Sequence, residues 1–222
     1  MSNKEHSNLG APASPPAPKA SESSQHEPKG WYSRDYLPHL DNPKLIQFIT
    51  FRLHDALPMQ ALKQIEEELK QIDAQPSQHV NLDAERRKRL EAYLDAGHGA
   101  CYLRDERIAR LIQDALCYFD GQHYRLLAWC IMPNHVHVVV EMLPGFALAQ
   151  IMHSWKTYTA RAANKLLHRE GSFWQREYYD RYMRDERHLA GAIAYVEQNP
   201  VKAGLVARAE DWPFGSARLR KA

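Results

Sequence analysis

Trp129-Cys-Ile-Met-Pro-Asn134-His135-Val136-His137-Val-Val-Val140 is the stretch that decides the fold, because a Pro-Asn turn separates two strand-like runs. The pattern predicts a hairpin of strands 124–132 and 135–142 that turns at Pro133-Asn134. Successive side chains of a strand point to opposite faces, so His135 and His137 share one face while Val136 and Val138 share the other. Two adjacent imidazoles indicate a divalent-metal site, although His-x-His can also be two polar residues on a solvated face.

The sequence on either side of this hairpin alternates between strand and helix patterns. Strands are expected over 45–53 and within 173–183, and helices over 59–73, 83–96, 103–119, 147–168 and 186–198, the last one stopped at Asn199-Pro200. This order predicts an α+β fold with an antiparallel sheet that has helices on one face, on the ferredoxin-like (split βαβ) plan. The open face of the sheet would then carry the two histidines.

The chain of 222 residues is long enough for one domain with extensions. Residues 1–29, rich in Ser, Pro and Ala, predict a disordered tail before a single domain over 30–222. Within that domain, residues 57–100 are expected to form a helical insertion, and residues 200–222 a C-terminal extension that packs on the domain.

Charge and cysteine usage narrow the class of protein. The net charge is +2, but residues 151–222 contain 13 Lys and Arg against 8 Asp and Glu, which indicates a polyanionic partner or a solvated basic helix face. Cys101, Cys117 and Cys130 form no Cys-x-x-Cys pair and are expected to be free thiols in a reducing cytoplasm. No membrane association is expected, because no apolar run reaches about 18 residues.

The helix over 186–198 contributes a candidate nucleophile. Tyr195 and Asn199 are four residues apart, so they are neighbours on a helix surface. A phenol has a free pKa of about 10 and needs activation to attack a phosphodiester. Asn199 could supply a third ligand, an oxygen, to Mg²⁺ or Mn²⁺. The alternatives are a half-buried aromatic at Tyr195 and a simple helix terminator at Asn199.

Several motifs together resemble those of the REP-associated tyrosine transposases, a branch of the single-tyrosine HUH transposases. Pro133-Asn-His-Val-His137 resembles the His-hydrophobic-His motif, and Tyr195-Val-Glu-Gln-Asn-Pro-Val-Lys-Ala-Gly-Leu205 resembles the tyrosine helix. The runs 30–38, 47–52 and 211–216 are also similar, so the resemblance spans about residues 30–218.

The resemblance implies a metal-dependent transposase, an endonuclease and strand transferase of single-stranded DNA, which uses Mg²⁺ or Mn²⁺ and no nucleotide cofactor. His135, His137 and Asn199 would be the metal ligands, and Tyr195 would form a 5′-phosphotyrosine intermediate at REP-like palindromic hairpins with an adjoining guide sequence. The position of Asn199 is a Gln in the insertion-sequence relatives. A domesticated hairpin-binding module with little or no turnover is the alternative, and a metal hydrolase that uses bound water is a third possibility.

DNA contacts are expected from a basic helix and from aromatic residues near the two ends of the domain. The expected contact residues are Trp31, Tyr32, Arg34, Lys156, Arg161, Lys165 and Trp212, with Trp31 and Trp212 alternatively packing the chain ends onto the domain. Phosphate contacts would make binding salt-dependent, and unpaired bases would stack on the rings. A monomer is expected rather than a dimer, located in the cytoplasm and associated with the nucleoid through DNA.

Overall fold

The structure is a computed structural model that describes residues 30–33, 38–41, 45–74 and 80–221, so the tail predicted over 1–29 lies outside it. Its strands and helices are β1 (Gly30–Ser33), β2 (Pro38–Asp41), β3 (Ile46–Arg52), α1 (Met59–Asp73), α2 (Leu82–Asp95), α3 (Glu106–Cys117), β4 (Tyr124–Ile131), β5 (His135–Met142), α4 (Leu148–Leu166), β6 (Tyr179–Tyr182) and α5 (Glu186–Lys202). None of the helices in these ranges has the length and apolar content needed to cross a membrane.

The central sheet has four strands in the order β4-β5-β3-β6, and each pair of neighbours is antiparallel. Helix α3 joins β3 to β4 while β5 lies between these strands, and α4 joins β5 to β6 while β3 lies between them. Each connection is therefore a split βαβ unit. The predicted α+β, ferredoxin-like fold is confirmed.

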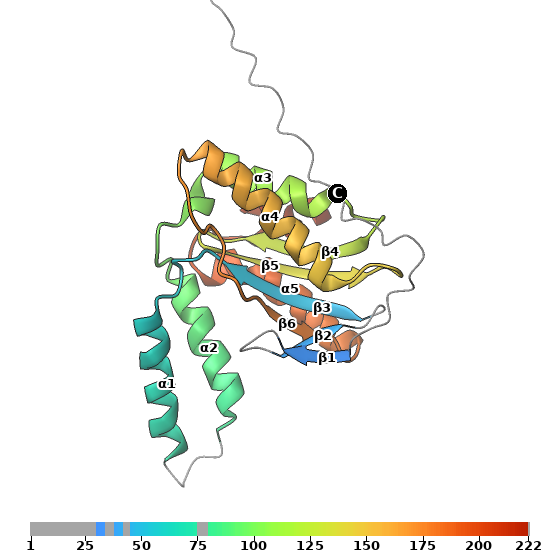
Figure 1. Ribbon diagram of the computed structural model, residues 1–222. Coiled ribbons are helices and arrows are strands. Elements are labelled where there is room, and N and C mark those ends of the chain that lie inside the picture. The colour runs from blue at the N-terminus through green and yellow to red at the C-terminus, as the bar shows by residue number, and fades with distance from the viewer. Residues whose placement is uncertain (1–29, 34–37, 42–44, 75–79, 222) are drawn as a thin grey trace, which may run out of the picture.

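Helices lie on both faces of the sheet. Val136, Val138 and Val140 belong to the core formed with α3 and α4, whereas Val139 packs with Val196 of α5 in a second cluster on the other face. Figure 1 shows α4 in front of the sheet and α5 behind it. The prediction of helices on one face holds for α3 and α4, but the expected open face is wrong.

The reason for the covered face lies in the strands themselves. Ala128 and Cys130 of β4 and Val139 of β5 are apolar on the face that carries the histidines, and all three are buried. An amphipathic helix gains free energy by covering such a surface. Helix α5 therefore places its side chains directly over His135 and His137.

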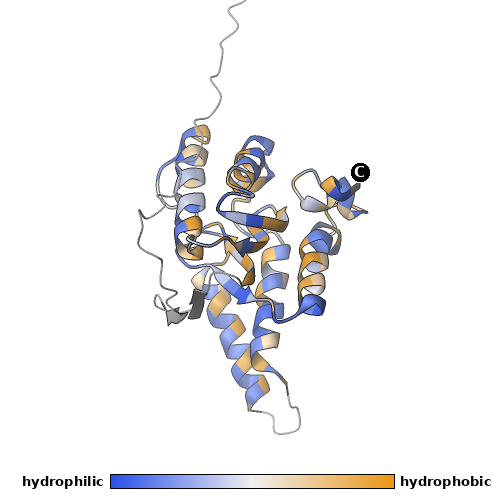
Figure 2. Cartoon of the chain, turned by 90° about the vertical axis from the view of Figure 1, so that its right-hand side faces the viewer, coloured by the Kyte–Doolittle hydropathy of each residue, from blue (hydrophilic) through white to orange (hydrophobic). Residues whose placement is uncertain are grey.

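Helices α1 and α2 form an antiparallel pair that extends away from the sheet (Figure 1). Ile65 and Leu69 are the buried residues of α1. Arg86 of α2 pairs with Glu66 at 2.5 Å, and Arg89 pairs with Glu68. Figure 2 shows apolar and polar residues alternating along both helices, as expected for a helix pair that is solvated on its outer faces.

Helix α5 does not stop at Asn199-Pro200 as predicted but continues to Lys202. A proline in the last turn removes its own N–H, yet the next turn still forms, because the Ala203 N–H donates to the Asn199 carbonyl at 2.9 Å. The chain then turns at Gly204, whose φ of +69° favours glycine. This extra turn places Lys202 beside Asp95 of α2.

Residues after α5 run along the outer edge of β4. The Ile131 N–H donates to the Phe214 carbonyl at 2.9 Å, and the Ser216 hydroxyl accepts from the Trp129 N–H at 3.1 Å. The same hydroxyl donates to Glu197 of α5 at 2.8 Å. These bonds join the C-terminal residues to both β4 and α5.

The three cysteines are free thiols, as predicted. Cys101 and Cys130 are buried and Cys117 is exposed at the end of α3.

Candidate metal and nucleophile site

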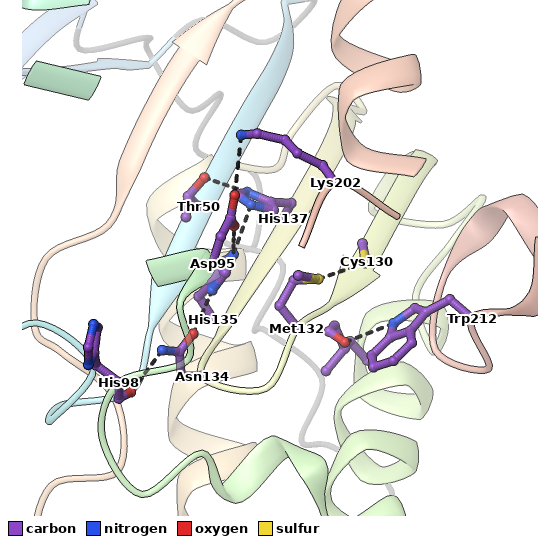
Figure 3. Close-up of polar contacts among 11 residues, drawn as sticks. Thr50, Asp95, His98, Cys130, Met132, Asn134, His135, His137, Lys202 and Trp212 are labelled. Atoms are coloured by element: carbon purple, nitrogen blue, oxygen red, sulfur yellow. Dashed lines mark hydrogen bonds and ion pairs between the residues drawn. The ribbon is translucent and has the colours of Figure 1, made fainter. Parts of the chain in front are cut away.

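His135 and His137 lie side by side on β5, beneath α5, and are 0% and 1% exposed. Their Nε2 atoms are 3.0 Å apart. Figure 3 shows the two rings with Asp95 and Lys202 gathered around them. The prediction that both histidines lie on one face of the strand is therefore confirmed, and their Nε2 atoms point toward each other.

Hydrogen bonds to the other ring nitrogens set the tautomer of His135. The Asn134 amide Nδ2 donates to the His98 carbonyl at 2.9 Å, which orients its Oδ1 as an acceptor. That oxygen lies 2.7 Å from His135 Nδ1, so Nδ1 carries the proton and Nε2 keeps its lone pair. His137 Nδ1 is similarly paired with the Thr50 hydroxyl at 2.8 Å.

Both imidazoles are neutral at physiological pH. Burial, with smaller contributions from Arg52 and Lys202, lowers the pKa of His135 to about 3. Burial also lowers the pKa of His137 well below its ordinary value, with His135 and Lys202 adding to the effect. A neutral imidazole is the form whose ring nitrogen can donate a lone pair to a metal cation.

Asp95, the last residue of α2, is the site residue that the sequence analysis missed. Its Oδ1 lies 3.8 Å from His135 Nε2, and its Oδ2 is 3.2 Å from Lys202 Nζ. Ligand atoms of Asp95, His135 and His137 all lie within 4.8 Å of one another. Oδ1 is buried without a hydrogen-bond partner in the described part of the chain. This is expected of an oxygen that would coordinate a cation.

One sequence signal for Asp95 exists in retrospect. A carboxylate in the last turn of a helix faces the negative end of the helix dipole and is disfavoured there. Asp95 occupies that position in α2, which has no basic residue in its last turn. An unfavourable charge of this kind suggests a tertiary partner, here Lys202 and the histidine pair.

Tyr195 lies over the same site. Its ring centroid is 5.5 Å from that of His137 and 5.8 Å from that of Phe48, and its hydroxyl is buried without a hydrogen bond of normal geometry. Burial raises the pKa of Tyr195, with the carboxylates of Glu91 and Asp95 adding to the shift. The phenol is therefore protonated at neutral pH.

Asn199 lies one turn beyond Tyr195 on α5 and is 0% exposed. Its Oδ1 and Nδ2 are both buried, and neither makes a hydrogen bond of normal geometry within the described residues, although the amide interacts with the Tyr195 hydroxyl. An unsatisfied buried amide costs free energy that a ligand would offset. Asn199 thus fits a role at the site, either toward a cation or toward substrate.

The neighbouring tyrosines are placed differently. Tyr178 is buried in the core formed with α3 and α4, and the Tyr179 hydroxyl accepts from Arg87 at 3.1 Å. Tyr182 pairs with Gln47 at the end of β6. Tyr195 is the residue of this group whose ring contacts His137.

The predicted DNA contacts on α4 are not part of this site. Lys156 donates to the carbonyls of Gln175 and Arg176 at 2.6 Å each. Arg161 and Lys165 are exposed, but α4 covers the face of the sheet opposite the histidines. Their role in DNA binding stays a prediction.

The aromatic contacts predicted near the chain ends have different outcomes. Trp212 is half-buried, and its Nε1 donates to the Ile131 carbonyl at 3.1 Å (Figure 3), which favours the packing alternative. Trp31 and Tyr32 lie in β1, but their side chains are outside the described part of the chain, as is the whole of Arg34.

Comparison with known proteins places the site in a family context. Residues 102–199, from the turn before α3 to Asn199, match the family described as "Transposase IS200 like". Over 107 residues the chain is 31% identical to a Haemophilus influenzae protein provisionally described as a REP-associated tyrosine transposase, covering 43% of this chain and 61% of that protein. Over 97 residues it is 25% identical to a REP-associated tyrosine transposase of Escherichia coli, covering 42% and 54%.

The fold comparison agrees with these matches. The structure of a REP-associated tyrosine transposase bound to a REP hairpin aligns with a TM-score of 0.52 and 15% identity over 84% of each chain. The sequence matches span less than two thirds of the length of either relative. The resemblance predicted from the motifs is confirmed for the segment that carries His135, His137 and Tyr195, whereas Asp95 lies before it.

Proposed function

We propose that this relative of the REP-associated tyrosine transposases nicks and rejoins single-stranded DNA at palindromic hairpins through a 5′-phosphotyrosine link at Tyr195. The observation that carries the proposal is the position of Tyr195. Its buried hydroxyl has no hydrogen bond of normal geometry, and its ring lies 5.5 Å from that of His137. Because no hydrogen bond of normal geometry holds it, the phenol would be free to turn toward a phosphate that reaches the site.

A divalent cation fits the donor set of this site. The Nε2 atoms of His135 and His137 and the carboxylate of Asp95 would hold it, and the Asn199 amide is a further candidate ligand. Imidazole with carboxylate suits Mn²⁺ well and is compatible with Mg²⁺. When bound, the ion would neutralise charge that develops on the phosphate.

The side chains around Tyr195 perform the remaining tasks. Tyr195 Oη forms the new bond to phosphorus while the bond from phosphorus to the 3′ oxygen breaks, and that oxygen takes up a proton from water, so the leaving strand ends in a 3′-hydroxyl. The phenolic proton needs an acceptor, and the carboxylate of Glu91, which interacts with the Tyr195 hydroxyl, is suitably placed. Reversal of the same step would rejoin strands, since the phosphotyrosine keeps the ester bond.

The test is a denaturing-gel assay with labelled single-stranded DNA from palindromic repeats that flank the gene. In Mn²⁺ or Mg²⁺ the parent protein should form a covalent adduct, which should disappear in EDTA and in Tyr195→Phe. Tyr118→Phe, at an exposed position after α3, is the matched control and should keep the adduct. Cleavage that leaves no adduct would instead indicate a bound-water hydrolase.

The partner is proposed to be a DNA hairpin with an adjoining guide sequence, bound by a monomer. Tight binding of the hairpin without cleavage, by a protein that retains bound Mn²⁺, would support the domesticated binding module instead. Light scattering with and without the hairpin measures the oligomeric state. A mass that doubles on addition of DNA would contradict the monomer.

A further inference from the structure

A pocket of about 570 Å³ lies beside Tyr195, between α2, β6 and α5. Apolar and aromatic side chains line part of it, namely Phe48, Tyr179, Met183 and Ala192. Basic side chains line another part, namely Arg87, Lys88, Arg181 and Arg187, together with His188. An apolar surface beside a basic one suits a ligand that has a flat ring and an anionic group.

Half of the basic lining comes from the run Arg86-Arg87-Lys88-Arg89 of α2. Arg86 and Arg89 face α1, where they pair with Glu66 and Glu68. The two residues between them face the pocket instead. Arg87 is held there by the hydrogen bond from its Nη1 to the Tyr179 hydroxyl at 3.1 Å. The four charges are thus divided between holding the helix pair together and lining the pocket.

The acidic residues of the pocket are Glu91 and Asp185, so the four Arg and Lys side chains of the lining outnumber them. Asp185 caps α5, since its Oδ1 accepts from the His188 N–H at 2.7 Å. Glu91 interacts with Tyr195. Both carboxylates therefore have structural partners, and the pocket keeps an excess of positive charge for an anion.

We infer that this pocket binds an unpaired nucleotide of the strand that Tyr195 attacks. Its phosphate lies against Arg87, Lys88, Arg181 and Arg187, and its base lies against Phe48, Tyr179 and Met183. Basic side chains beside aromatic rings are the usual means of holding single-stranded DNA without pairing it. The inference rests on the proposed function, because Tyr195 forms a wall of both the pocket and the metal site.

The α1–α2 pair thereby acquires a role in substrate binding. The segment that matches the transposase family begins at residue 102, after both helices. Arg87 and Lys88 therefore belong to a part of the chain outside that match. The pair supplies Asp95 to the metal site and the two basic residues to the strand.

The experiment compares two charge-reversal pairs by fluorescence anisotropy on the full-length protein. Lys88→Glu with Arg187→Glu changes two exposed residues of the pocket, and Lys63→Glu with Arg110→Glu changes two exposed residues of α1 and α3. The probes are hairpin oligonucleotides with single-stranded flanks, each shortened by one nucleotide at a time from the 5′ or the 3′ end. Affinity is measured over a salt series.

The pocket pair should weaken binding of the fully flanked hairpin about tenfold or more, while the control pair changes it less than about twofold. Loss of the contact with the phosphate in the pocket should also reduce the slope of log K against log salt by about 0.7. One of the two flanks supplies the nucleotide that enters the pocket. When this flank is shortened, the parent should bind the shortened probe as weakly as the pocket pair binds the fully flanked probe.

Equal affinities for the pocket pair and the control pair would overturn the inference, as would the absence of DNA binding by the parent. The covalent-adduct assay on the parent separates this result from the proposed function. An adduct with unchanged binding by the pocket pair rejects the pocket alone. Weakened binding by the pocket pair without any adduct rejects the nicking reaction and keeps the pocket.

Discussion

Asp95 shows how much of the metal site depends on a single side chain. It is the one carboxylate of the described residues that completes a cluster of ligand type with His135 and His137. The ion pair with Lys202 at 3.2 Å holds its Oδ2, which leaves Oδ1 directed at the histidines. Affinity for a cation should therefore depend strongly on this residue.

Asp95→Asn should lower the affinity for Mn²⁺ at least tenfold, because a neutral amide replaces the anionic ligand. Isothermal titration calorimetry on the parent and the variant measures the change. Asp114→Asn, an exposed position on α3, is the control and should bind like the parent. If Asp95→Asn keeps full affinity, the ligand set is the histidine pair with Asn199.

Asn134 lies one step further from the candidate metal site, behind His135. Because its amide bridges the His98 carbonyl and His135 Nδ1, it fixes both the ring orientation and the tautomer. Loss of such a partner commonly costs about 10–100-fold in metal affinity.

Asn134→Ala should weaken Mn²⁺ binding by about that factor, and Asn134→Asp should recover most of it, because a carboxylate still accepts from His135 Nδ1. Calorimetry again gives the affinities. Thermal melting of the metal-free variants shows whether each is folded. Equal affinities for the two variants would argue against control of the tautomer by Asn134.

Glu91 gives a prediction about pH. Burial raises the pKa of its carboxyl above the ordinary value, with the interaction with the Tyr195 hydroxyl opposing the shift. A raised pKa in the folded state contributes stability below the ordinary Glu pKa, and this contribution is lost as pH rises through the folded pKa.

Glu91→Gln should therefore melt at a higher temperature than the parent at pH 7, with the difference shrinking toward pH 4. Thermal unfolding over this pH range in EDTA measures it. Glu67→Gln, on an exposed position of α1, is the control. A parent that is destabilised by Glu91→Gln at pH 7 would show that the ionised carboxylate is stabilising instead.

Among the elements, β5 was predictable from the sequence and α5 only in part. The alternation around Val136 placed both histidines on one face, as the structure shows. The run Val138-Val139-Val140 is apolar at every position, which is typical of a strand buried on both faces. That run was a signal for a helix over the histidines, but periodicity alone does not say which helix provides the cover.

Asp95 was not predictable for a different reason. It lies 40 residues before His135 in the sequence, in a helix with a weakly amphipathic pattern. Only the tertiary arrangement of α2 and α5 brings it to the site, through the contact with Lys202. Short-range spacing rules find ligands that share one strand or one helix, and Asp95 of α2 shares neither β5 with the histidines nor α5 with Tyr195.

The helix pair α1–α2 should unfold more easily than the sheet, since it extends from the body and is solvated on its outer faces (Figure 2). Leu69→Ala removes one of the two buried side chains of α1 and should cost about 2 kcal/mol, near the low end for such changes. Hydrogen exchange should accelerate in residues 59–73 and stay slow in β5. Acceleration in both elements would mean that the pair and the sheet unfold together.

At the scale of the whole molecule, the basic residues divide between the two sides of the sheet. Arg161 and Lys165 are exposed on α4, while the pocket of Lys88 and Arg187 adjoins Tyr195 on the side of α5. A short single strand held at Tyr195 does not extend to α4, because the sheet lies between them. Only a longer substrate, such as a hairpin with its stem, could contact both surfaces.

Arg161→Glu with Lys165→Glu should therefore weaken binding of a hairpin that carries a full stem, and leave binding of a short unpaired oligonucleotide within about twofold of the parent. Anisotropy with the two probes at one salt concentration measures both affinities, and the pocket variants Lys88→Glu with Arg187→Glu should, in contrast, weaken binding of the short oligonucleotide. If the α4 variant loses the short oligonucleotide as strongly as the hairpin, its charges act on the strand through the long-range field of the molecule. In that case the affinity difference should disappear at about 0.5 M salt, where screening confines charge interactions to a few ångströms.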